Sequence, residues 1–236
     1  MKDQLLIQKL NDSIQEKDPF EVIAEIQMEY KNDVVFTSSL GIEDQVVLDL
    51  LIKNKYDFKL ITLDTGRLYN ETYNLIEKSE RVLKKKFEIY FPHFETLESF
   101  IKEKGINSFY DSIENRKECC RIRKILPLGR ALHRAKFWVT GLRREQDLSR
   151  SEIQFAEWDE KFNLIKLNPL LNWTEEKVWN HIKINNIPYN PLHDQGFPSI
   201  GCAPCTRAIL PGESIRAGRW WWENQNQKEC GLHTKE

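Results

Sequence analysis

Hydrophobic positions along the chain follow two spacings in turn. Apolar residues recur at helical intervals over residues 1–30, 43–53, 69–86 and 174–185. Short apolar runs, which are typical of buried strands, lie at 34–36, 59–63, 87–91, 137–139 and 164–167. Strands that alternate with helices are joined by crossover connections, which favour a parallel sheet. The pattern therefore predicts an α/β fold with a mainly parallel sheet flanked by helices.

The regular pattern stops near residue 190. Four prolines then interrupt the chain, with several glycines among them, at positions 191, 198, 204 and 211. Because such a composition breaks helices and strands, we expect an irregular C-terminal extension of one domain that covers residues 1–236. Residues 1–30 would form an N-terminal helical segment. Residues 223–228 are wholly polar, which predicts a mobile arm over 223–236.

Composition and charge narrow the class of protein. The 236 residues are 40% hydrophobic and 30% charged, which is typical of a globular protein. The formal net charge of −1 provides no bulk basic field, so we expect no nucleic-acid partner. The charged N-terminus has no signal-peptide core, and no apolar run is long enough to cross a bilayer. We therefore predict a cytoplasmic protein whose thiols stay reduced.

Five cysteines are the strongest chemical signal. Cys119 and Cys120 are adjacent, Cys202 and Cys205 are separated by two residues, and Cys230 lies near the end. An odd number in a reducing compartment indicates metal binding or catalysis rather than disulfides. Four cysteines suit zinc or an iron–sulfur cluster, and the adjacent pair fits a cluster better, since its irons are spread in space. The alternative is that the adjacent pair is merely buried, but residues 116–124 are too charged for a core segment.

Two predicted strands end in segments suited to an anion. The first continues into a loop that contains Ser38, Ser39 and Gly41 ahead of a helix, where free backbone N–H groups and the helix dipole favour negative charge. The second continues into the Asp64-Thr65-Gly66 turn. Each has an ordinary alternative, an N-cap for the serines and a simple strand-to-helix turn for the second.

Three segments together resemble the assimilatory adenylyl-sulfate reductases, relatives of phosphoadenylyl-sulfate reductase. They are Lys-Glu-Cys-Cys-Arg-Ile-Arg-Lys at 117–124, the Cys202–Cys205 pair, and Lys-Glu-Cys-Gly-Leu-His at 228–233. The resemblance runs from about residue 34 to 233. It implies an adenine-nucleotide alpha hydrolase-like (Rossmann-like) fold, and a 4Fe–4S cluster held by Cys119, Cys120, Cys202 and Cys205.

The resemblance also implies the reaction and its partners. Cys230 would be the nucleophile, supported by Lys124 and His233, that takes the sulfo group from adenylyl sulfate as a cysteine S-sulfonate. Thioredoxin or glutaredoxin would then release sulfite, in sulfate assimilation for cysteine biosynthesis. A homo-oligomer is implied by resemblance alone. The serine loop departs from the Ser-Gly-Gly-x-Asp-Ser form of ATP pyrophosphatases, which fits a phosphosulfate ligand rather than ATP hydrolysis.

Arginines are the side chains best suited to the two negative groups of such a substrate. The candidates for substrate binding are Arg123, Arg143, Arg144, Arg216 and Arg219. For each, the alternative is a solvated surface charge. Trp220, Trp221 and Trp222 are interpreted as local packing that covers the site. The histidines other than His233 show no ligand spacing and are treated as structural.

Three other functions stay open on the sequence. The first is reduction of 3′-phosphoadenylyl sulfate, alone or together with adenylyl sulfate; the two cysteine pairs favour adenylyl sulfate. The second is an ATP pyrophosphatase-type enzyme that thiolates tRNA, which the altered loop and near-neutral charge disfavour. The third is a non-enzymatic iron–sulfur or zinc module, which leaves Cys230 and the strand-end loops without a role.

Overall fold

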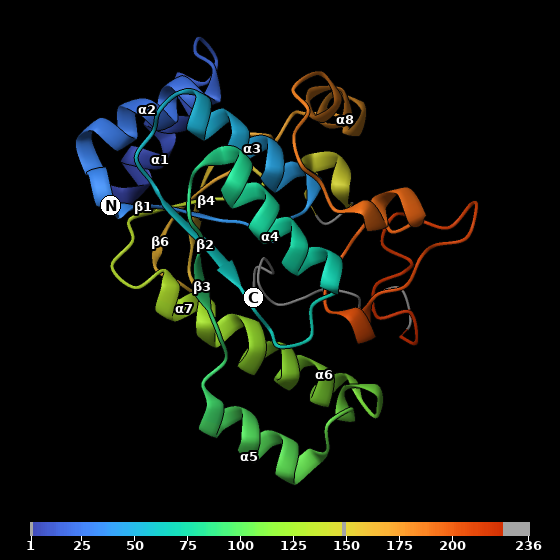
Figure 1. Ribbon diagram of the computed structural model, residues 1–236. Helices are drawn as coiled ribbons and strands as arrows, with labels where there is room; N and C mark the ends of the chain where they lie inside the picture. Colours follow the sequence, from blue (N-terminus) through green and yellow to red (C-terminus); the bar gives the residue numbers. More distant parts are fainter. Residues whose placement is uncertain (1, 148–149, 224–236) are drawn as a thin grey trace. The chain divides into compact units, whose positions relative to one another are not determined.

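The computed structural model describes residues 2–147 and 150–223 (Figure 1). Its α-helices are α1 (Lys2–Ser13), α2 (Pro19–Tyr30), α3 (Ile42–Lys53), α4 (Asn70–Leu83), α5 (Phe94–Lys104), α6 (Ile113–Cys120), α7 (Leu126–Ala131) and α8 (Glu175–Ile184). Its strands are β1 (Val34–Thr37), β2 (Lys59–Leu63), β3 (Glu88–Tyr90), β4 (Phe137–Val139), β5 (Ala156–Asp159) and β6 (Leu164–Leu167). A π-helical turn, Arg121–Ile125, joins α6 to α7.

One six-stranded sheet has the order β3-β2-β1-β4-β6-β5. β1 pairs in parallel with β2 and β4, and β4 pairs in parallel with β6. The predicted α/β fold with a mainly parallel sheet is therefore confirmed. The sequence pattern did not find β5, which pairs antiparallel with β6 at the edge of the sheet.

Helix boundaries follow ordinary capping chemistry. The Asp18 side chain accepts a hydrogen bond from the backbone N–H of Phe20, and Pro19 occupies the first turn of α2. The Thr174 hydroxyl accepts from the N–H of Lys177 at the start of α8. Apolar faces of the helices around β1, β4 and β6 bury one continuous core, which includes Phe36, Val46 and Phe137.

The chain divides into two compact units. The first comprises Met1–Thr62, Asn74–Glu88 and Leu132–Asn190, and it holds most of the sheet. The second comprises Leu63–Tyr73, Ile89–Ala131 and Pro191–Glu236. Within its described part, short 3₁₀ turns at Pro191–Gln195 and Ala203–Cys205 replace longer elements after residue 190. The single domain over 1–236 stays a prediction, as does the arm, most of which lies outside the described residues.

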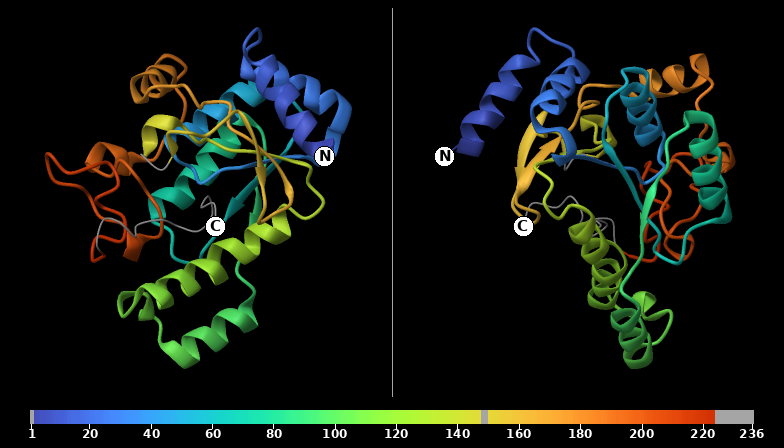
Figure 2. Two further views of the ribbon diagram at one scale, coloured as in Figure 1. Left: turned by 180° about the vertical axis from the view of Figure 1, so that it is seen from behind. Right: turned by 60° about the vertical axis from the view of Figure 1, so that its left-hand side comes forward.

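The β5 edge of the sheet is covered by α1, which runs beside the last two strands (Figure 2). The Asn11 side chain accepts from the N–H of Ala156 at 2.9 Å and donates to the carbonyl of the same residue at 3.0 Å. A side-chain amide thus takes the place of a neighbouring strand. Edge strands are sites of unwanted pairing, so this contact protects the sheet.

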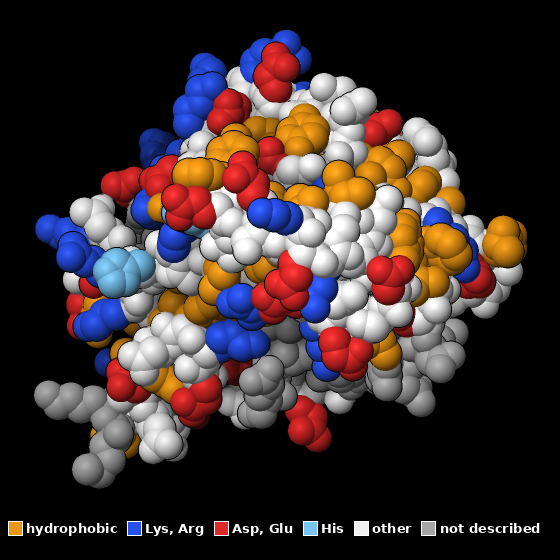
Figure 3. All heavy atoms as spheres, turned by 90° about the horizontal axis from the view of Figure 1, so that it is seen from below, with side chains coloured by type: hydrophobic (Ala, Val, Ile, Leu, Met, Phe, Trp, Pro, Cys, Tyr) orange, Lys and Arg blue, Asp and Glu red, His pale blue; other side chains and the backbone are white. Residues whose placement is uncertain are grey.

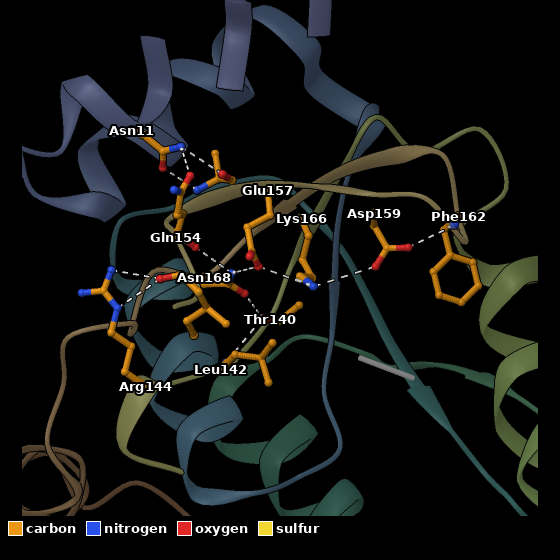
Figure 4. A network of polar contacts seen from close by, with 12 residues as sticks. Asn11, Thr140, Leu142, Arg144, Gln154, Glu157, Asp159, Phe162, Lys166 and Asn168 are labelled. Atoms are coloured by element: carbon orange, nitrogen blue, oxygen red, sulfur yellow. Dashed lines mark hydrogen bonds and ion pairs between the residues drawn. The ribbon is translucent and has the colours of Figure 1, made fainter. Parts of the chain in front are cut away.

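Behind that edge lies a buried polar network (Figure 4). The Lys166 ammonium lies 3.6 Å from Glu157 and 3.9 Å from Asp159, and all three side chains are at most 10% exposed. Asn168 connects the network to the residue after β4, because its side-chain N–H donates to Glu157 at 3.2 Å and its side-chain oxygen accepts from the hydroxyl of Thr140 at 2.6 Å. Among the described residues no helix is both long and apolar enough to cross a membrane.

Candidate active site

The end of α6 carries the adjacent cysteines. The helix begins at the Ser112 cap, whose hydroxyl accepts from the N–H of Asn115. Cys119 and Cys120 occupy its last two positions, and the chain then widens into the π-helical turn. Turns of this kind are rare and frequent at functional sites. Here the turn carries Arg123, whose guanidinium donates to the carbonyl of Thr65 at 2.6 Å.

Four cysteines from two distant segments line one pocket in the second unit. Cys119, Cys120 and Cys202 are buried and Cys205 is partly buried. All four are free thiols. The other lining residues are Arg67, Phe109, Arg116, Arg123, Lys124 and Trp220. The pocket therefore combines sulfur donors with four cationic side chains.

The protein environment does not favour free thiolates in this pocket. Burial raises the pKa of Cys205 to about 12, and the neighbouring Cys202 acts in the same direction, against Lys124 and Arg219. Burial also raises the pKa of Cys119, while Arg123 lowers it. Such thiols are poor nucleophiles, and they lose their protons when a metal binds.

The turn after β2 lies against the same pocket. The Thr65 hydroxyl is 3.3 Å from the sulfur of Cys202. Asp64 accepts from the N–H of Gly66 at 2.7 Å and from the hydroxyl of Tyr73 at 2.8 Å. Gly66 has φ +70°, a conformation that favours glycine, and a Cβ there would lie 3.5 Å from Arg123. The structure thus brings Asp64, Thr65, Gly66 and Arg123 together.

Sequence reasoning missed a buried guanidinium beside the cysteines. Arg116 is 1% exposed, lines the pocket, and forms a two-pronged ion pair with Glu223. Its guanidinium carbon lies 4.8 Å from the ring centroid of Trp220, as does that of Arg219. The signal in the sequence was the spacing, because Arg116 precedes Cys119 by one helical turn and so falls on the same face.

The three consecutive tryptophans, Trp220, Trp221 and Trp222, differ in their burial and contacts. Trp220 is 1% exposed and lines the cysteine pocket, whereas Trp221 is 47% exposed. Trp222 packs against the cluster that contains Phe109 and Cys119.

Two further predicted substrate-binding arginines lie in the same segment. Arg219 is buried, and its Nη1 lies 3.4 Å from the carbonyl oxygen of Ile200. Arg216 is partly buried in the same segment.

The serine loop lies in the first unit and is held by its own helix. The backbone N–H and the hydroxyl of Ser39 donate to Asp44 at 2.6 and 2.7 Å. The Ser38 hydroxyl accepts from the N–H of Leu40, whose φ of +64° is strained for a branched residue. Gly41 has an ordinary φ of −68° at the N-cap of α3.

Asp44, which the sequence reasoning did not select, is the centre of that loop. Burial raises the pKa of Asp44 to about 6, although the hydrogen bonds from Ser39 act in the opposite direction. Gly141, after β4, packs against it, since a Cβ there would lie 2.4 Å from an Asp44 carboxylate oxygen. The Ser-x₄-Asp spacing was the available signal, because it places a carboxylate within reach of the loop N–H groups.

Two predicted substrate-binding arginines are engaged inside the first unit. Arg143 donates from Nε and Nη2 to Glu43 at 3.0 and 2.8 Å. Arg144 donates to the carbonyl of Ile153 and to the side chain of Asn172. Their role in substrate binding stays a prediction, as do those of Arg216 and Arg219. Cys230 and His233 lie outside the described residues.

The donor set fits an iron–sulfur cluster in its chemistry. Four thiols meet cationic side chains that can balance thiolate charge, and the buried Nε of Arg123 has no hydrogen-bond partner among the described residues. Within the same part of the chain, no group of three or more His, Cys, Asp or Glu residues is placed to hold a metal ion.

Solved structures confirm the fold class. A phosphoadenylyl-sulfate reductase from Candida auris, in a phosphate complex, is 29% identical with a TM-score of 0.72; the match covers 86% of this chain and 96% of that one. The FMN adenylyltransferase of Candida glabrata, 16% identical with a TM-score of 0.55 over 95% and 77% of the two chains, shares the fold alone. The chain is therefore an adenine-nucleotide alpha hydrolase-like α/β protein.

Sequence relatives define the family. Residues 33–208 match the phosphoadenosine phosphosulfate reductase domain, and the chain belongs to that family. The adenosine 5′-phosphosulfate reductase of Allochromatium vinosum is 50% identical over 205 residues, which are 87% of this chain and 80% of that protein. The enzyme of the same name from Neisseria meningitidis serogroup A is 51% identical, over 85% and 83% of the two chains. The predicted family resemblance is thereby confirmed.

Proposed function

We propose that this protein is an adenylyl-sulfate reductase, which converts adenylyl sulfate to sulfite and AMP. The observation that carries the proposal is the pocket in which Cys119, Cys120, Cys202 and Cys205 meet four cationic side chains. Relatives named for this activity are about half identical over most of the chain, which supports the same substrate.

The four pocket cysteines are assigned as ligands of a 4Fe–4S cluster. When bound, the cluster would supply negative charge and a fixed framework beside Lys124 and the pocket arginines. Arg123 holds the Thr65 carbonyl and so fixes the turn after β2. The Thr65 hydroxyl beside Cys202 is placed to donate to its thiolate.

The nucleophile is assigned to Cys230. Its thiolate attacks the sulfur of adenylyl sulfate, the bond between sulfur and the phosphate oxygen breaks, and AMP leaves with the electron pair. One thiol of reduced thioredoxin or glutaredoxin then attacks the sulfur of Cys230 and releases sulfite, and the second thiol resolves the mixed disulfide. The reductase returns to its thiol form and the donor leaves as a disulfide.

Two sets of groups are assigned to substrate binding, each within its own unit. In the first unit, Ser38, Ser39 and Gly41 lead into α3, whose first turn offers N–H groups to an anion, and Arg143 and Arg144 lie after β4. In the second unit, the turn at 64–66 and Arg123, Arg216 and Arg219 supply donors and positive charge. Positive charge stabilises both the bound anion and the departing AMP.

The decisive test uses protein purified without oxygen. Iron analysis should give about four irons per chain, and Cys202→Ser should lose them. Wild type mixed with adenylyl sulfate but no reductant should carry a sulfonate on Cys230 in mass spectrometry, whereas Cys230→Ser should keep the iron and form none. Addition of thioredoxin should then release sulfite. A sulfonate that persists in Cys230→Ser would disprove the assigned nucleophile.

The second candidate substrate is 3′-phosphoadenylyl sulfate. The Candida auris structure is a reductase of that substrate, but it is 29% identical, against about 50% for the adenylyl-sulfate enzymes. We therefore expect a higher kcat/KM for adenylyl sulfate, with an equal or higher value for the 3′-phosphorylated compound as the contrary outcome.

A tRNA-thiolating enzyme and a zinc module receive less support. The first needs a basic surface, but acidic and basic side chains are interspersed on the face in Figure 3, and the net charge is −1. A zinc module would be colourless and would contain no iron. The same iron analysis therefore separates it from the proposed enzyme.

A further inference from the structure

The described part of the chain ends in a buried ion pair. Glu223 accepts from Nε of Arg116 at 2.9 Å and from Nη2 at 2.7 Å, with the two side chains 4% and 1% exposed. This paired geometry is the strongest and most directional form of an Arg–carboxylate contact. Because the desolvation of both charges offsets much of its net stability, its value lies in fixing two groups in one geometry.

Both cysteine-bearing segments contribute to the same anchorage. Arg116 belongs to α6, one turn before Cys119, and lines the cysteine pocket. On the other side, the N–H of Trp220 donates to the carbonyl of Cys205 at 3.0 Å. Trp220 has φ +41°, so the chain turns sharply there, three residues before Glu223. The residue from which the C-terminal segment departs is thus fixed to both sides of the pocket.

The distance that Cys230 can cover follows from its place in the sequence. It lies seven positions after Glu223. A fully extended chain of that length spans at most about 25 Å. A fixed Glu223 therefore keeps the Cys230 thiol within about 25 Å of the Arg116–Glu223 pair, which raises its effective concentration in that volume.

We propose that Arg116 and Glu223 are positioning residues: their ion pair fixes the start of the segment that carries Cys230 and thereby delivers the thiol to its target. This inference rests on the proposed function, in which Cys230 is the nucleophile. Neither residue touches the reacting atoms. Their effect is transmitted through the chain between Glu223 and Cys230.

The test is Glu223→Gln, which keeps the shape of the side chain and removes its charge. Iron content and KM for adenylyl sulfate should match wild type, whereas the single-turnover rate of Cys230 sulfonation should fall roughly 10- to 100-fold. In the absence of substrate, alkylation of Cys230 by iodoacetamide should become several-fold faster, because the segment that carries the thiol is no longer held at Glu223. Glu223→Asp, which retains the charge, should lie between the two.

A matched control is available in the same part of the chain. Arg207 and Glu213 form another two-pronged pair, at 2.8 Å for both contacts, but it is 36% and 29% exposed and does not line the cysteine pocket. Glu213→Gln should leave the sulfonation rate, KM and the alkylation rate unchanged.

Two results would overturn the proposal. One is a Glu223→Gln protein with full iron whose sulfonation and alkylation rates equal those of wild type. The other is loss of iron in that variant, which would assign the pair to support of the cysteine pocket instead. If wild type forms no sulfonate at all, the proposed function fails, while the alkylation comparison still tests the anchorage.

Discussion

At the scale of single residues, the sites depend on buried charges with assigned partners. Arg116 faces Glu223, Arg143 faces Glu43, and Asp44 takes two hydrogen bonds from Ser39. Each pair fixes a backbone segment that carries site residues. Removal of one partner leaves the other buried and unmatched, which costs about 3 to 5 kcal/mol for a charge.

Asp44 gives a pH-dependent prediction. Burial raises its pKa from the ordinary 3.8 to about 6, so between these values the folded protein holds a proton that the unfolded chain releases. Stability therefore falls as pH rises through this window, by about 3 kcal/mol in total. Asp44→Asn cannot ionise, and it should remove this loss and become more stable than wild type at pH 8.

The measurement is urea unfolding of wild type and Asp44→Asn between pH 5 and 8. The advantage of the variant should shrink as pH falls below about 6. Asp57→Asn, at a side chain that is 92% exposed, is the matched control and should show no such trend. Parallel pH profiles for wild type and Asp44→Asn would contradict the prediction.

At the scale of elements, sequence patterns located most of the sheet and its helices. Val34–Thr37 and Lys59–Leu63 were found because central parallel strands are apolar runs. β5 was missed, since an edge strand with Glu157 and Asp159 in it resembles a loop. The π-helical turn was missed as well, because no local residue preference distinguishes it from an α-helix.

Residues of the site were predictable where spacing carried the information. The Cys202–Cys205 pair and the adjacent cysteines could be grouped from the sequence, and the structure places them in one pocket. The internal partners of Arg143 and Arg144 could not be foreseen, because they come from segments up to 100 residues away. The spacing of Arg116 to Cys119 could have placed it beside the cysteines, but its burial was hidden, since arginine is rarely buried without a partner.

The contact between α1 and β5 gives a prediction about the sheet edge. Asn11→Ala should lose both hydrogen bonds to Ala156 and reduce the free energy of unfolding by about 1 to 3 kcal/mol. Because the uncovered edge can pair with another chain, the variant should also self-associate more strongly.

Urea unfolding and light scattering on a sizing column check both effects. Asn54→Ala is the control, because among the described residues the Asn54 side-chain amide bonds only the carbonyl of Leu50, in the helix that Asn54 caps. Stability and association equal to those of this control would show that Asn11 does not protect the edge.

At the scale of the whole molecule, the two compact units depend on different kinds of interaction. The first is organised by a large apolar core around the sheet. In the second, the buried cluster around the cysteines is small: Phe100, Phe109, Cys119 and Ile122. The second unit should therefore depend on the proposed cluster far more than the first unit does.

Hydrogen exchange can test this difference. Cys202→Ser, or removal of iron by a chelator, should lower protection in α6, the π-helical turn and residues 199–207. Amides of β1, β4 and β6 should keep their protection. A uniform loss of protection across both units would contradict the expectation, and a Cys230→Ser protein should behave like wild type.

The pocket draws on sulfurs that are far apart along the chain, since Cys120 and Cys202 are 82 positions apart. No ribosome-bound chain can complete this set until most of the polypeptide has emerged. Insertion of the proposed cluster would thus be a late event that follows synthesis of the sheet. A cluster held by both cysteine pairs would link the two segments and close a long loop. By limiting the freedom of the denatured chain, it would act as an inorganic counterpart of a disulfide.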